Sequence, residues 1–527
     1  MPKILVADKL SDEGVKIFQE AGFQVDCKYK QPEAELVKII GDYDALVVRS
    51  DTKVTAAVIA AANKMKVIGR AGVGIDNVDV EAATKKGIIV MNAPGGNTIS
   101  TCEQAFTLLM SLARNTPAAH MSVWKDRKWE KAKFKGVEVY SKVLGIVGMG
   151  RIGKEMAKRA IAFGMEVIVA DPFVTQEVAD KLGVTLVSLE DLLKRADFVT
   201  IHAPLTPETK NLISAAQLAM MKPKAFLINC ARGEIVDEEA LYQALKEKKI
   251  AAAALDVFVN EPPVNSKLYE LENIVMTPHL GASTEEAQVS VAIEIAHCIK
   301  DALAGKAIRN ALNYAQLDPE TYKVIEPYFK LCEKMGKFVS QLAEGGTREI
   351  KISYIGEISS YKTDVLASAL VRGFFASQLE NDVNYINALE TAKNRGVKVE
   401  QVKIREEEEY VNTIRLKVVT DKQEMLLEGT LFANKQARFV RIDDVAMEIA
   451  PSDYMLVINN KDKPGTIGFL GTTLGSHSIN IAGMSLGRRA TGAMALTVLN
   501  LDSQLDEKVI KAITANPNIV SLKVIKL

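Results

Sequence analysis

Three polar residues of types that perform acid–base chemistry each follow an apolar run typical of a buried strand. They are Arg232, Glu261 and His279, and the chain has only five histidines. The carboxyl ends of parallel strands share one edge of an open α/β sheet, so these side chains are expected to meet there. A carboxylate bonded to an imidazole fixes its tautomer and suits it to take and return a proton near neutral pH. A guanidinium offers a planar pair of donors to a carboxylate.

Each of the three also has a plain structural explanation when taken singly. Arg232 could be a surface charge, and a lone His279 is more often structural than catalytic. Convergence of all three beside a cofactor site reverses that expectation. We therefore interpret Arg232, Glu261 and His279 as a catalytic set, whereas His202 is expected to line the cofactor edge without acid–base work.

A glycine-rich turn after residues 143–147 predicts a dinucleotide site. Gly148, Gly150 and Gly153 form G-x-G-x-x-G directly after an apolar strand and directly before a helix. The first glycine permits the tight turn, the second lets the backbone approach a pyrophosphate, and the third lets helix and strand pack closely. The pyrophosphate is expected at the helix N-terminus, where free N–H groups and the dipole favour an anion.

The glycine turn alone is weak evidence, because a turn without a ligand can share it, and Asp171 strengthens it. Asp171 ends the next predicted strand. A carboxylate there accepts hydrogen bonds from ribose hydroxyls and repels a 2′-phosphate. Pro172 and Phe173 follow, with no arginine that would bind a 2′-phosphate. The pattern therefore predicts NAD rather than NADP.

Short apolar runs alternate with helical patterns over the first 300 residues, which predicts two doubly wound parallel-sheet domains of the Rossmann-like or flavodoxin-like kind. The strands of the first are expected at 3–7, 23–26, 45–49, 66–70 and 88–92. Those of the second are expected at 143–147, 166–170, 198–202, 225–230, 251–257 and 274–277. A helix over 101–113 would connect the two, and one over 284–304 would return the chain to the first domain.

Beyond residue 314 the pattern changes to an α+β mixture. Helices are expected over 314–342, 363–378 and 382–394, and strands over 349–355, 413–419, 425–433 and 439–442. From Asp453 the chain reads strand, helix, strand, strand, helix, strand, which is a ferredoxin-like βαββαβ unit. We therefore divide the chain into residues 1–97 with 284–313, then 98–283, 314–452 and 453–527.

Composition limits the classes of function. Lys plus Arg and Asp plus Glu are both 66, and zero formal net charge argues against a general nucleic-acid or membrane-surface binder. The five cysteines are scattered without a C-x-x-C pair or a zinc pattern, which predicts a cytoplasmic protein without disulfides or a bound metal. No apolar stretch approaches the ~18 residues of a membrane span, and the opening apolar run is too short for a signal peptide.

Several segments together resemble the D-isomer-specific 2-hydroxyacid dehydrogenases. In the second domain they are the glycine turn with Asp171, and residues 229–233, 256–262 and 278–283; in the first they are 48–50, 69–79 and 92–97. Residues 1–310 carry the closest resemblance. Residues 314–450 are similar to the intervening domain of the long-chain members that oxidise phosphoglycerate, and 453–527 are similar to an ACT domain.

The resemblance implies a role for each matching residue. His279 would be the acid–base group, Glu261 its partner, and Arg232 the residue that binds the substrate carboxylate and polarises the keto oxygen. Contacts with NAD are implied for Gly148, Gly150, Arg151, Ile152, Gly153, Asp171, Thr206, Cys230, Ala231, Arg232, Asp256, His279, Gly281 and Ala282, with Asp256 near the nicotinamide carboxamide. Contacts with substrate are implied for Arg49, Ser50, Arg70, Gly72, Val73, Gly74, Asn97, Arg232 and His279.

The implied reaction is the oxidation of 3-phospho-D-glycerate to 3-phosphooxypyruvate with NAD, the first step of phosphorylated serine biosynthesis. Arg49 and Arg70 suit an anionic phosphate, which favours this substrate over glycolate or lactate. Some relatives place an arginine of a neighbouring subunit near the phosphate, whereas the cations of residues 131–135 here are all lysines. The resemblance also implies a homodimer through the cofactor domains, or a homotetramer completed by the tail domains.

The ACT-like unit could bind an effector. Pro464 and Gly465 shape an exposed turn that leads into a helix, and the free N–H groups of that helix suit a carboxylate. Asp462 suits an ammonium group, and Asn480 of a paired copy could reach the same place. The hypothesis is that L-serine binds there and inhibits, which requires unequal binding to active and inactive states. The alternative is a unit kept only for assembly.

Two other functions stay open. One is a glyoxylate or hydroxypyruvate reductase of the same family, although those are typically short and lack the two C-terminal domains. The other is an NAD(H)-sensing binding protein, such as a transcriptional corepressor, which can keep residues like Arg232, Glu261 and His279. The ACT-like tail favours the enzyme over the corepressor.

Overall fold

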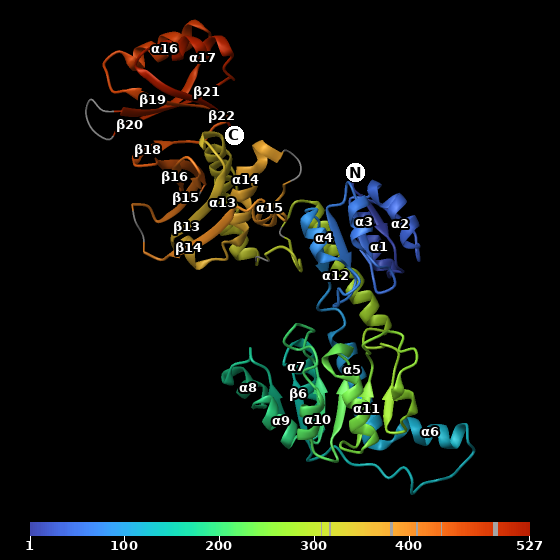
Figure 1. Ribbon diagram of the computed structural model, residues 1–527. Helices are drawn as coiled ribbons and strands as arrows, with labels where there is room; N and C mark the ends of the chain where they lie inside the picture. The colour runs from blue at the N-terminus through green and yellow to red at the C-terminus, as the bar shows by residue number, and fades with distance from the viewer. Residues whose placement is uncertain (307, 316–317, 380–382, 407–408, 434, 489–493) are drawn as a thin grey trace.

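Four sheets, each with its own helices, follow one another along the chain (Figure 1). The computed structural model describes residues 1–306, 308–315, 318–379, 383–406, 409–433, 435–488 and 494–527. Within these residues no helix is both long and apolar enough to cross a membrane. The first and second sheets form the paired domains that build the site described below.

The first sheet has five parallel strands in the order β2-β1-β3-β4-β5. The long helix α12 (Glu285–Leu303) returns from the second sheet and packs against this one, as predicted. Ile295 and Ile299 of α12 lie so close to Gly69 that a Cβ there would clash, so only glycine fits. The other elements are β1 (Lys3–Val6), α1 (Asp12–Glu20), β2 (Gln24–Cys27), α2 (Glu33–Ile39), β3 (Ala45–Val48), α3 (Ala56–Ala61), β4 (Val67–Arg70), α4 (Val80–Lys85) and β5 (Ile89–Asn92).

The second sheet has seven parallel strands in the order β12-β11-β10-β9-β6-β7-β8, and its strand order reverses between β6 and β9. Ligands bind outside the carboxyl ends of the strands at such a reversal. The strands are β6 (Val143–Val147), β7 (Glu166–Ala170), β8 (Thr185–Leu186), β9 (Phe198–Ile201), β10 (Phe226–Asn229), β11 (Ala252–Leu255) and β12 (Ile274–Met276). The helices are α7 (Arg151–Ala162), α8 (Gln176–Leu182), α9 (Leu189–Arg195), α10 (Ala215–Met220) and α11 (Glu238–Lys246).

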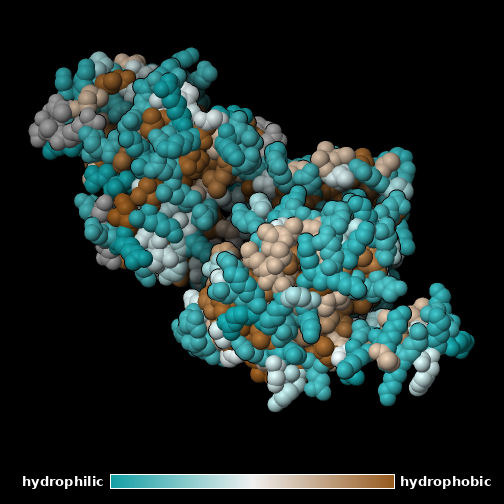
Figure 2. Space-filling model, turned by 60° about the horizontal axis from the view of Figure 1, so that its bottom comes forward, coloured by the Kyte–Doolittle hydropathy of each residue, from teal (hydrophilic) through white to brown (hydrophobic). Residues whose placement is uncertain are grey.

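Two helices connect the first two sheets. The predicted connector is α5 (Thr98–Arg114), which begins three residues earlier than expected. Asn115 then adopts a left-handed conformation with φ of 50°, and a second helix, α6 (Thr116–Trp124), follows that was not predicted. With the chain that follows it, α6 forms an arm that stands off from the second sheet (Figures 1 and 2).

The third sheet is mixed, in the order β14-β13-β15-β16-β17-β18, and α13 (Pro319–Leu342) and α14 (Asp364–Leu379) pack on each other beside it. Strands β14 (Lys398–Ile404) and β18 (Val445–Ile449) were not predicted. Both lie at the ends of the sheet order, and neither is a continuous buried run: β14 has no buried residue, and β18 alternates buried and exposed residues. The remaining elements are β13 (Thr347–Gly356), α15 (Ala388–Asn394), β15 (Asn412–Thr420), β16 (Glu424–Phe432) and β17 (Gln436–Ile442).

The helix predicted over 382–394 is wrong at its start. Within the described residues it begins at Ala388, because Asn384 and Asn387 form a turn instead. The Asn387 side chain accepts from Asn384 N, and the Asn384 side chain accepts from Ile386 N. Such bonds compete with helix formation. Residues 380–382 lie outside the description.

The fourth sheet confirms the βαββαβ prediction. It is antiparallel, in the order β20-β21-β19-β22. Its elements are β19 (Tyr454–Lys461), α16 (Thr466–Ser476), β20 (Ile481–Arg488), β21 (Met494–Leu501), α17 (Glu507–Thr514) and β22 (Ile519–Lys526). Strand β20 packs beside β18 of the third sheet, so the last two units are joined side by side (Figure 1).

Candidate functional site

The three glycines of the turn between β6 and α7 have three different surroundings. Gly148 has φ of 93°, in the left-handed region that side chains rarely adopt. A Cβ on Gly153 would clash with the Gly148 carbonyl, which shows how closely the helix packs on the turn. A Cβ on Gly150 would meet no atom within 4 Å. The turn therefore leaves open space beside Gly150, at the N-terminus of α7, where a pyrophosphate fits.

Asp171 follows β7 and is bonded to the same turn. One carboxylate oxygen accepts from Met149 N at 2.7 Å, and the other accepts from Phe173 N at 2.8 Å. Each oxygen keeps a second lone pair for a ribose hydroxyl. Arg151 and Ile152 begin α7 beside this turn. The residues present therefore fit a dinucleotide at the point where the strand order reverses.

The ends of β9 and β10 form the opposite wall. Cys230 follows β10 and is buried, and burial together with the charge of Asp256 raises the pKa of its thiol well above the ordinary value. His202 follows β9; burial lowers its pKa to about 4, and its Nε2 lies 3.0 Å from Thr200 Oγ1. His202 is therefore neutral at physiological pH, which agrees with its predicted lack of an acid–base role. Thr206 lies further along this wall, its amide donating to Thr209 Oγ1.

Glu261 and His279 form the predicted pair. His279 Nδ1 lies 2.7 Å from Glu261 Oε2, and Phe258 N donates to the other carboxylate oxygen at 3.1 Å. Burial alone would raise the pKa of Glu261, but the hydrogen bond and charge of His279 hold it below its ordinary value, with smaller help from Phe258 and Arg232. An ionised carboxylate only accepts, so Nδ1 carries a proton and Nε2 is left to exchange one. The His279 side chain is 48% exposed, so Nε2 can reach a ligand.

Asp256 holds the loop that presents His279. It is fully buried, and its carboxylate accepts from Leu280 N and Gly281 N, both at 2.8 Å, and from Thr277 Oγ1 at 2.5 Å. The backbone of His279 has φ of 55°, a conformation that residues with a side chain rarely adopt, and these bonds maintain it. The proposed contact of Asp256 with the nicotinamide carboxamide is not tested by this arrangement; the anchoring role was missed in the sequence.

The Asp256→Asn variant is expected to be less stable by about 2 kcal/mol or more, and to turn over at least tenfold more slowly. Asparagine offers one acceptor oxygen where four donors now converge, including Gln104 Nε2 at 3.4 Å, and each buried donor left unpaired costs about 1–3 kcal/mol. Denaturant unfolding and steady-state rates measure both effects. Asp237→Asn is the control, because Asp237 caps α11 by accepting from Ala240 N, and asparagine caps equally well. An equal effect of the two substitutions would contradict the anchoring role.

Three guanidinium groups converge on the cleft between the first two domains. Burial, together with the positive charges of Arg232 and Arg49, lowers the pKa of Arg70 to about 10. Its Nε is buried without a hydrogen-bond partner. Such mutual repulsion, only partly offset by Asp76 and Asp8, is what an anion would relieve.

The loop of Gly72, Val73 and Gly74 passes directly over two of these groups. A Cβ on Gly72 would clash with the guanidinium of Arg70, and a Cβ on Gly74 with that of Arg232. Asn92 Nδ2 donates to the Val73 carbonyl at 2.7 Å and holds the loop in place. The glycines predicted to contact substrate therefore also make room for Arg70 and Arg232, the arginines predicted to bind it.

Two of the predicted substrate residues lie at loop ends in the first domain. Asp8 is buried and accepts from Arg49 N at 2.5 Å and from Thr52 Oγ1 at 2.6 Å, which fixes the loop that carries Arg49 and Ser50. Asn97 precedes α5, and its Oδ1 is buried without a partner. An unpartnered polar atom there is consistent with a ligand contact.

Asp76 pairs with Arg232, and the sequence did not single it out. Its carboxylate accepts from Arg232 Nε at 3.2 Å, and Arg232 Nη1 donates to the Ala231 carbonyl at 2.7 Å. The ion pair spans the cleft, because Asp76 belongs to the first domain and Arg232 to the second. Asp76 lies inside the segment 69–79 that carried the family resemblance, but no local pattern pointed to this partner.

The remaining cofactor residues lie in one stretch. Gly281 and Ala282 follow His279, and the Gly281 carbonyl accepts from Ser100 Oγ at 2.5 Å and Thr101 Oγ1 at 3.0 Å. Helix α5 therefore helps to hold the loop that Asp256 anchors, and Gln104 of α5 donates to Asp256 as well. Within the described ranges no group of three or more His, Cys, Asp or Glu side chains could hold a metal ion.

Two of the residues predicted to bind an effector already have side-chain partners within the chain. Gly465, with φ of 90°, precedes α16 as expected. However, Asp462 already accepts from Arg488 Nη1 at 2.8 Å, so its carboxylate is not free for an ammonium group. Asn480 donates to Asp502 at 2.7 Å. Pro464 lies in the exposed turn before Gly465.

Two family models match the chain. The NAD binding domain of D-isomer specific 2-hydroxyacid dehydrogenases matches residues 106–281, and the D-3-phosphoglycerate dehydrogenase intervening domain matches residues 324–443. The first range contains the glycine turn, Arg232, Glu261 and His279, and the second contains most of the third sheet. The family assignment and the intervening domain expected from the sequence are therefore confirmed.

Several proteins similar over the full length of this chain are D-3-phosphoglycerate dehydrogenases. D-3-phosphoglycerate dehydrogenase of Synechocystis sp. is 44% identical over all of this chain and 95% of its own, and that of Methanocaldococcus jannaschii is 44% identical over all of both. The NAD⁺-bound crystal structure of 3-phosphoglycerate dehydrogenase from Entamoeba histolytica has a TM-score of 0.51 and 30% identity, covering 60% of this chain and 99% of that one. The chain therefore belongs to the D-isomer-specific 2-hydroxyacid dehydrogenase family, and within it to the D-3-phosphoglycerate dehydrogenases.

Proposed function

We propose that this chain oxidises 3-phospho-D-glycerate to 3-phosphooxypyruvate with NAD as acceptor. The observation that carries the proposal is the Glu261–His279 pair at 2.7 Å, facing a cleft with three arginines. An acid–base pair beside a dinucleotide site suits the removal of a hydroxyl proton, and the arginines suit a substrate with several negative charges.

His279 Nε2 takes the proton of the C2 hydroxyl in the forward direction and returns it in reverse. Glu261 holds Nδ1 and stabilises the positive charge that the ring then carries. Arg232 binds the substrate carboxylate and polarises the C2 oxygen through its planar donor fork. Bound NAD supplies the hydride acceptor. Asp76 holds Arg232 through the Arg232 Nε, which leaves other guanidinium N–H groups available to substrate.

Arg49 and Arg70 would bind the phosphate. Both belong to the first domain, whereas the acid–base pair belongs to the second, so substrate would lie between the two. The half-buried Arg70, with its buried, unpartnered Nε and lowered pKa, gains most from an anion. A substrate without a phosphate leaves these charges uncompensated, which is the physical reason to disfavour glycolate or lactate.

The direct test is to mix the protein with 3-phosphoglycerate and NAD and follow NADH absorbance. Turnover with 3-phosphoglycerate, and little with glycerate, glycolate or lactate, is the expected result. Faster reduction of glyoxylate or hydroxypyruvate would instead favour the specificity of the glyoxylate or hydroxypyruvate reductases of this family. Binding of NADH without turnover of any of these acids would favour an NAD(H)-sensing protein.

Asp171 should determine the choice of cofactor. The native chain is expected to use NAD and to discriminate strongly against NADP, because the Asp171 carboxylate repels a 2′-phosphate. In Asp171→Ala the ratio of kcat/KM for the two cofactors should narrow by about tenfold or more, since each ~1.4 kcal/mol is tenfold.

Asp171 also accepts from Met149 N, so a second substitution separates charge from loop anchoring. Asp171→Asn keeps an acceptor oxygen for that amide and removes the charge. It should relax the preference as alanine does, with less loss of activity with NAD. A native protein that uses both cofactors equally would contradict the role given to Asp171.

L-serine is the effector proposed for the tail unit. Its carboxylate would lie at the N-terminus of α16, near Gly465 and Pro464, and its ammonium near Asp462 and Asn480. Asp462 would have to share its carboxylate with Arg488, which weakens this proposal relative to the catalytic one.

Titration of L-serine into the full chain should give saturable calorimetric heat and reduce kcat/KM about 5-fold or more, the lower end of ordinary allosteric coupling. D-serine is the matched control, because it has the same charges in the wrong arrangement. If neither enantiomer binds, the tail unit serves assembly alone.

Assembly into a homodimer through the second domain is also proposed. The arm that begins with α6 exposes large apolar side chains, with Trp124 62% and Trp129 84% accessible, which is unusual for a surface that stays in water. The tail offers a second surface: the exposed face of α16 carries Gly468, Gly471 and Gly475, where a Cβ would meet no atom, and could extend a dimer to a tetramer. Light scattering of the full chain measures the mass.

A further inference from the structure

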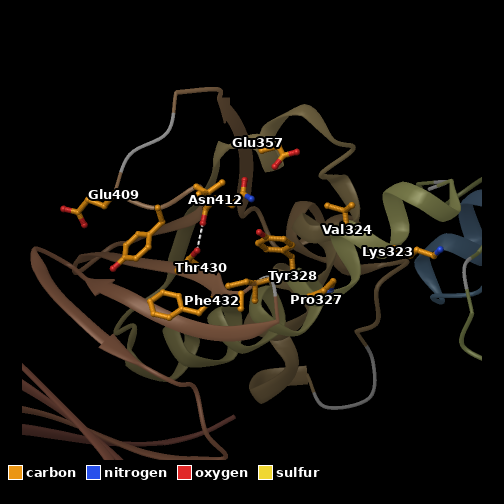
Figure 3. A pocket seen from close by; sticks show the side chains of 13 residues that line it. Lys323, Val324, Pro327, Tyr328, Glu357, Glu409, Asn412, Thr430 and Phe432 are labelled. Carbon is orange, nitrogen blue, oxygen red and sulfur yellow. Dashed lines mark hydrogen bonds between the residues drawn. The ribbon is translucent and has the colours of Figure 1, made fainter.

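The third domain contains a cavity of about 770 Å³ that the proposed dehydrogenase reaction does not use (Figure 3). It lies between the first turns of α13, the end of β16 and the chain that enters β15. Much of its wall is apolar, formed by Val324, Pro327, Val411, Leu431 and Phe432. Its size falls within the range of small-molecule sites.

Aromatic rings make up much of the inner surface. Tyr328 points into the middle of the cavity, with Phe432 below it (Figure 3). Tyr410 pairs with Phe432 at a ring-centroid distance of 6.0 Å. The faces of such rings carry partial negative charge and attract cations.

A carboxylate completes this negative environment. Glu357 lies at the rim above Tyr328, and among the described residues no cation lies within ion-pair distance of it (Figure 3). Burial raises the pKa of Tyr328, a hydrogen bond with Asn412 partly opposes this, and the negative charge of Glu357 adds to it, which brings the pKa to about 12. Tyr328 is therefore a neutral hydroxyl facing an unpaired charge.

The other two charged residues of the lining are directed elsewhere. Lys323 extends away from Tyr328, toward the first domain, and Glu409 extends outward on the opposite side (Figure 3). Glu409 lies 3.6 Å from Arg441, and its side chain is 72% exposed. The charge that the cavity itself presents is therefore that of Glu357.

Around the cavity one backbone carbonyl lacks its helical donor, and two side chains of the lining are already hydrogen-bonded to their neighbours. Pro327 lies inside α13 and has no N–H, so the carbonyl of Lys323 lacks its usual helical donor. The Thr430 hydroxyl donates to the Asn412 carbonyl at 2.5 Å, and Asn412 Oδ1 accepts from Ile358 N at 2.7 Å. A ligand that brings its own donors and positive charge suits this lining.

We propose that this cavity binds an organic cation: a small molecule with an ammonium group on an apolar body. The ammonium lies between the Glu357 carboxylate and the ring of Tyr328, and the apolar body packs against Tyr410, Phe432 and Val411. A phosphate or carboxylate ligand is excluded here, because it would face Glu357 without a compensating cation.

The test uses the full chain and three probes of similar shape: phenethylammonium, 2-phenylethanol and phenylacetate. Calorimetric titration should show saturable binding of the cation at or below the millimolar range, about tenfold weaker binding of the neutral alcohol, and none of the anion. Equal binding of the three, tighter binding of the anion, or no saturable binding of the cation up to about 10 mM would overturn the proposal.

Two glutamates of the lining provide matched variants. Glu357→Gln should weaken the cation about tenfold and leave the alcohol unchanged, whereas Glu409→Gln should change neither, because that carboxylate faces outward. Dehydrogenase activity, measured in parallel, should be unaffected in both and verifies that the chain is folded. If Glu357→Gln binds the cation as tightly as the native chain does, the carboxylate is not part of a site and the proposal fails.

Discussion

Replacement of His279 by alanine is expected to lower kcat by about a hundredfold or more. The imidazole is the only group in the described cleft placed to exchange the C2 proton through a free nitrogen, and such general acid–base groups contribute about 10²–10⁴-fold. Steady-state rates with 3-phosphoglycerate and NAD measure the loss, and the KM for NAD should change little. His477→Ala is the control, because His477 ends α16 in the tail unit.

Glu261→Gln should produce a smaller loss, of about tenfold or more. The amide can still bond His279 but no longer compensates the charge of the protonated ring. The pKa of Glu261 is held below its ordinary 4.5, so the carboxylate stays ionised above about pH 5 and its stabilising charge is lost only as pH falls below that range. Between about pH 6 and pH 9 the ratio of native to variant rates should therefore not follow ionisation of Glu261 itself. Near-normal turnover of His279→Ala would overturn the whole assignment.

Replacement of Arg232 by glutamine should lower kcat/KM for 3-phosphoglycerate by about 30- to 4,000-fold. Loss of one partner of a desolvated, charge-assisted hydrogen bond costs about 2–5 kcal/mol, and each 1.4 kcal/mol is tenfold. Arg232→Lys should recover little of this, because lysine has no planar fork to bind a carboxylate while it keeps Asp76 paired.

The control for charge is Arg309→Gln. Arg309 pairs with Asp301 at 2.7 Å on the surface, and its side chain is 52% exposed. That substitution removes one positive charge far from the acid–base pair, so kcat/KM should stay within about twofold of the native value. A loss equal to that of Arg232→Gln would mean that net charge, and not the position of Arg232, binds the substrate.

The periodicity of apolar residues was enough to predict the βαββαβ tail and the parallel strands of the first two sheets, except the two-residue edge strand β8. Burial on both faces of a strand, or on one, leaves a direct mark on the sequence. The third sheet was predicted less completely. Its edge strand β14 has no buried residue and β18 exposes Ala446 and Glu448, so neither forms the continuous apolar run of a buried strand. The start of α15 was wrong for a related reason, since Asn384 and Asn387 stabilise a turn locally.

The same division holds at the site. Strand ends placed Arg232, Glu261 and His279 at one sheet edge, and the glycine spacing indicated the dinucleotide turn, because both follow from residues close together in the chain. The ion pair of Arg232 with Asp76 joins residues 156 positions apart, and Asp256 meets Leu280 and Gly281 across 24 and 25 positions.

The sequence by itself thus determined the type of fold, the family and the chemistry of the reacting groups, because these depend on local patterns of burial, turn geometry and side-chain type. Only the tertiary structure decided which charges compensate one another: Asp76 pairs with Arg232 and Arg488 with Asp462, whereas no described cation pairs with Glu357. Electrostatic partners are selected by distance in space, and that distance is set by how whole domains pack rather than by any spacing along the chain.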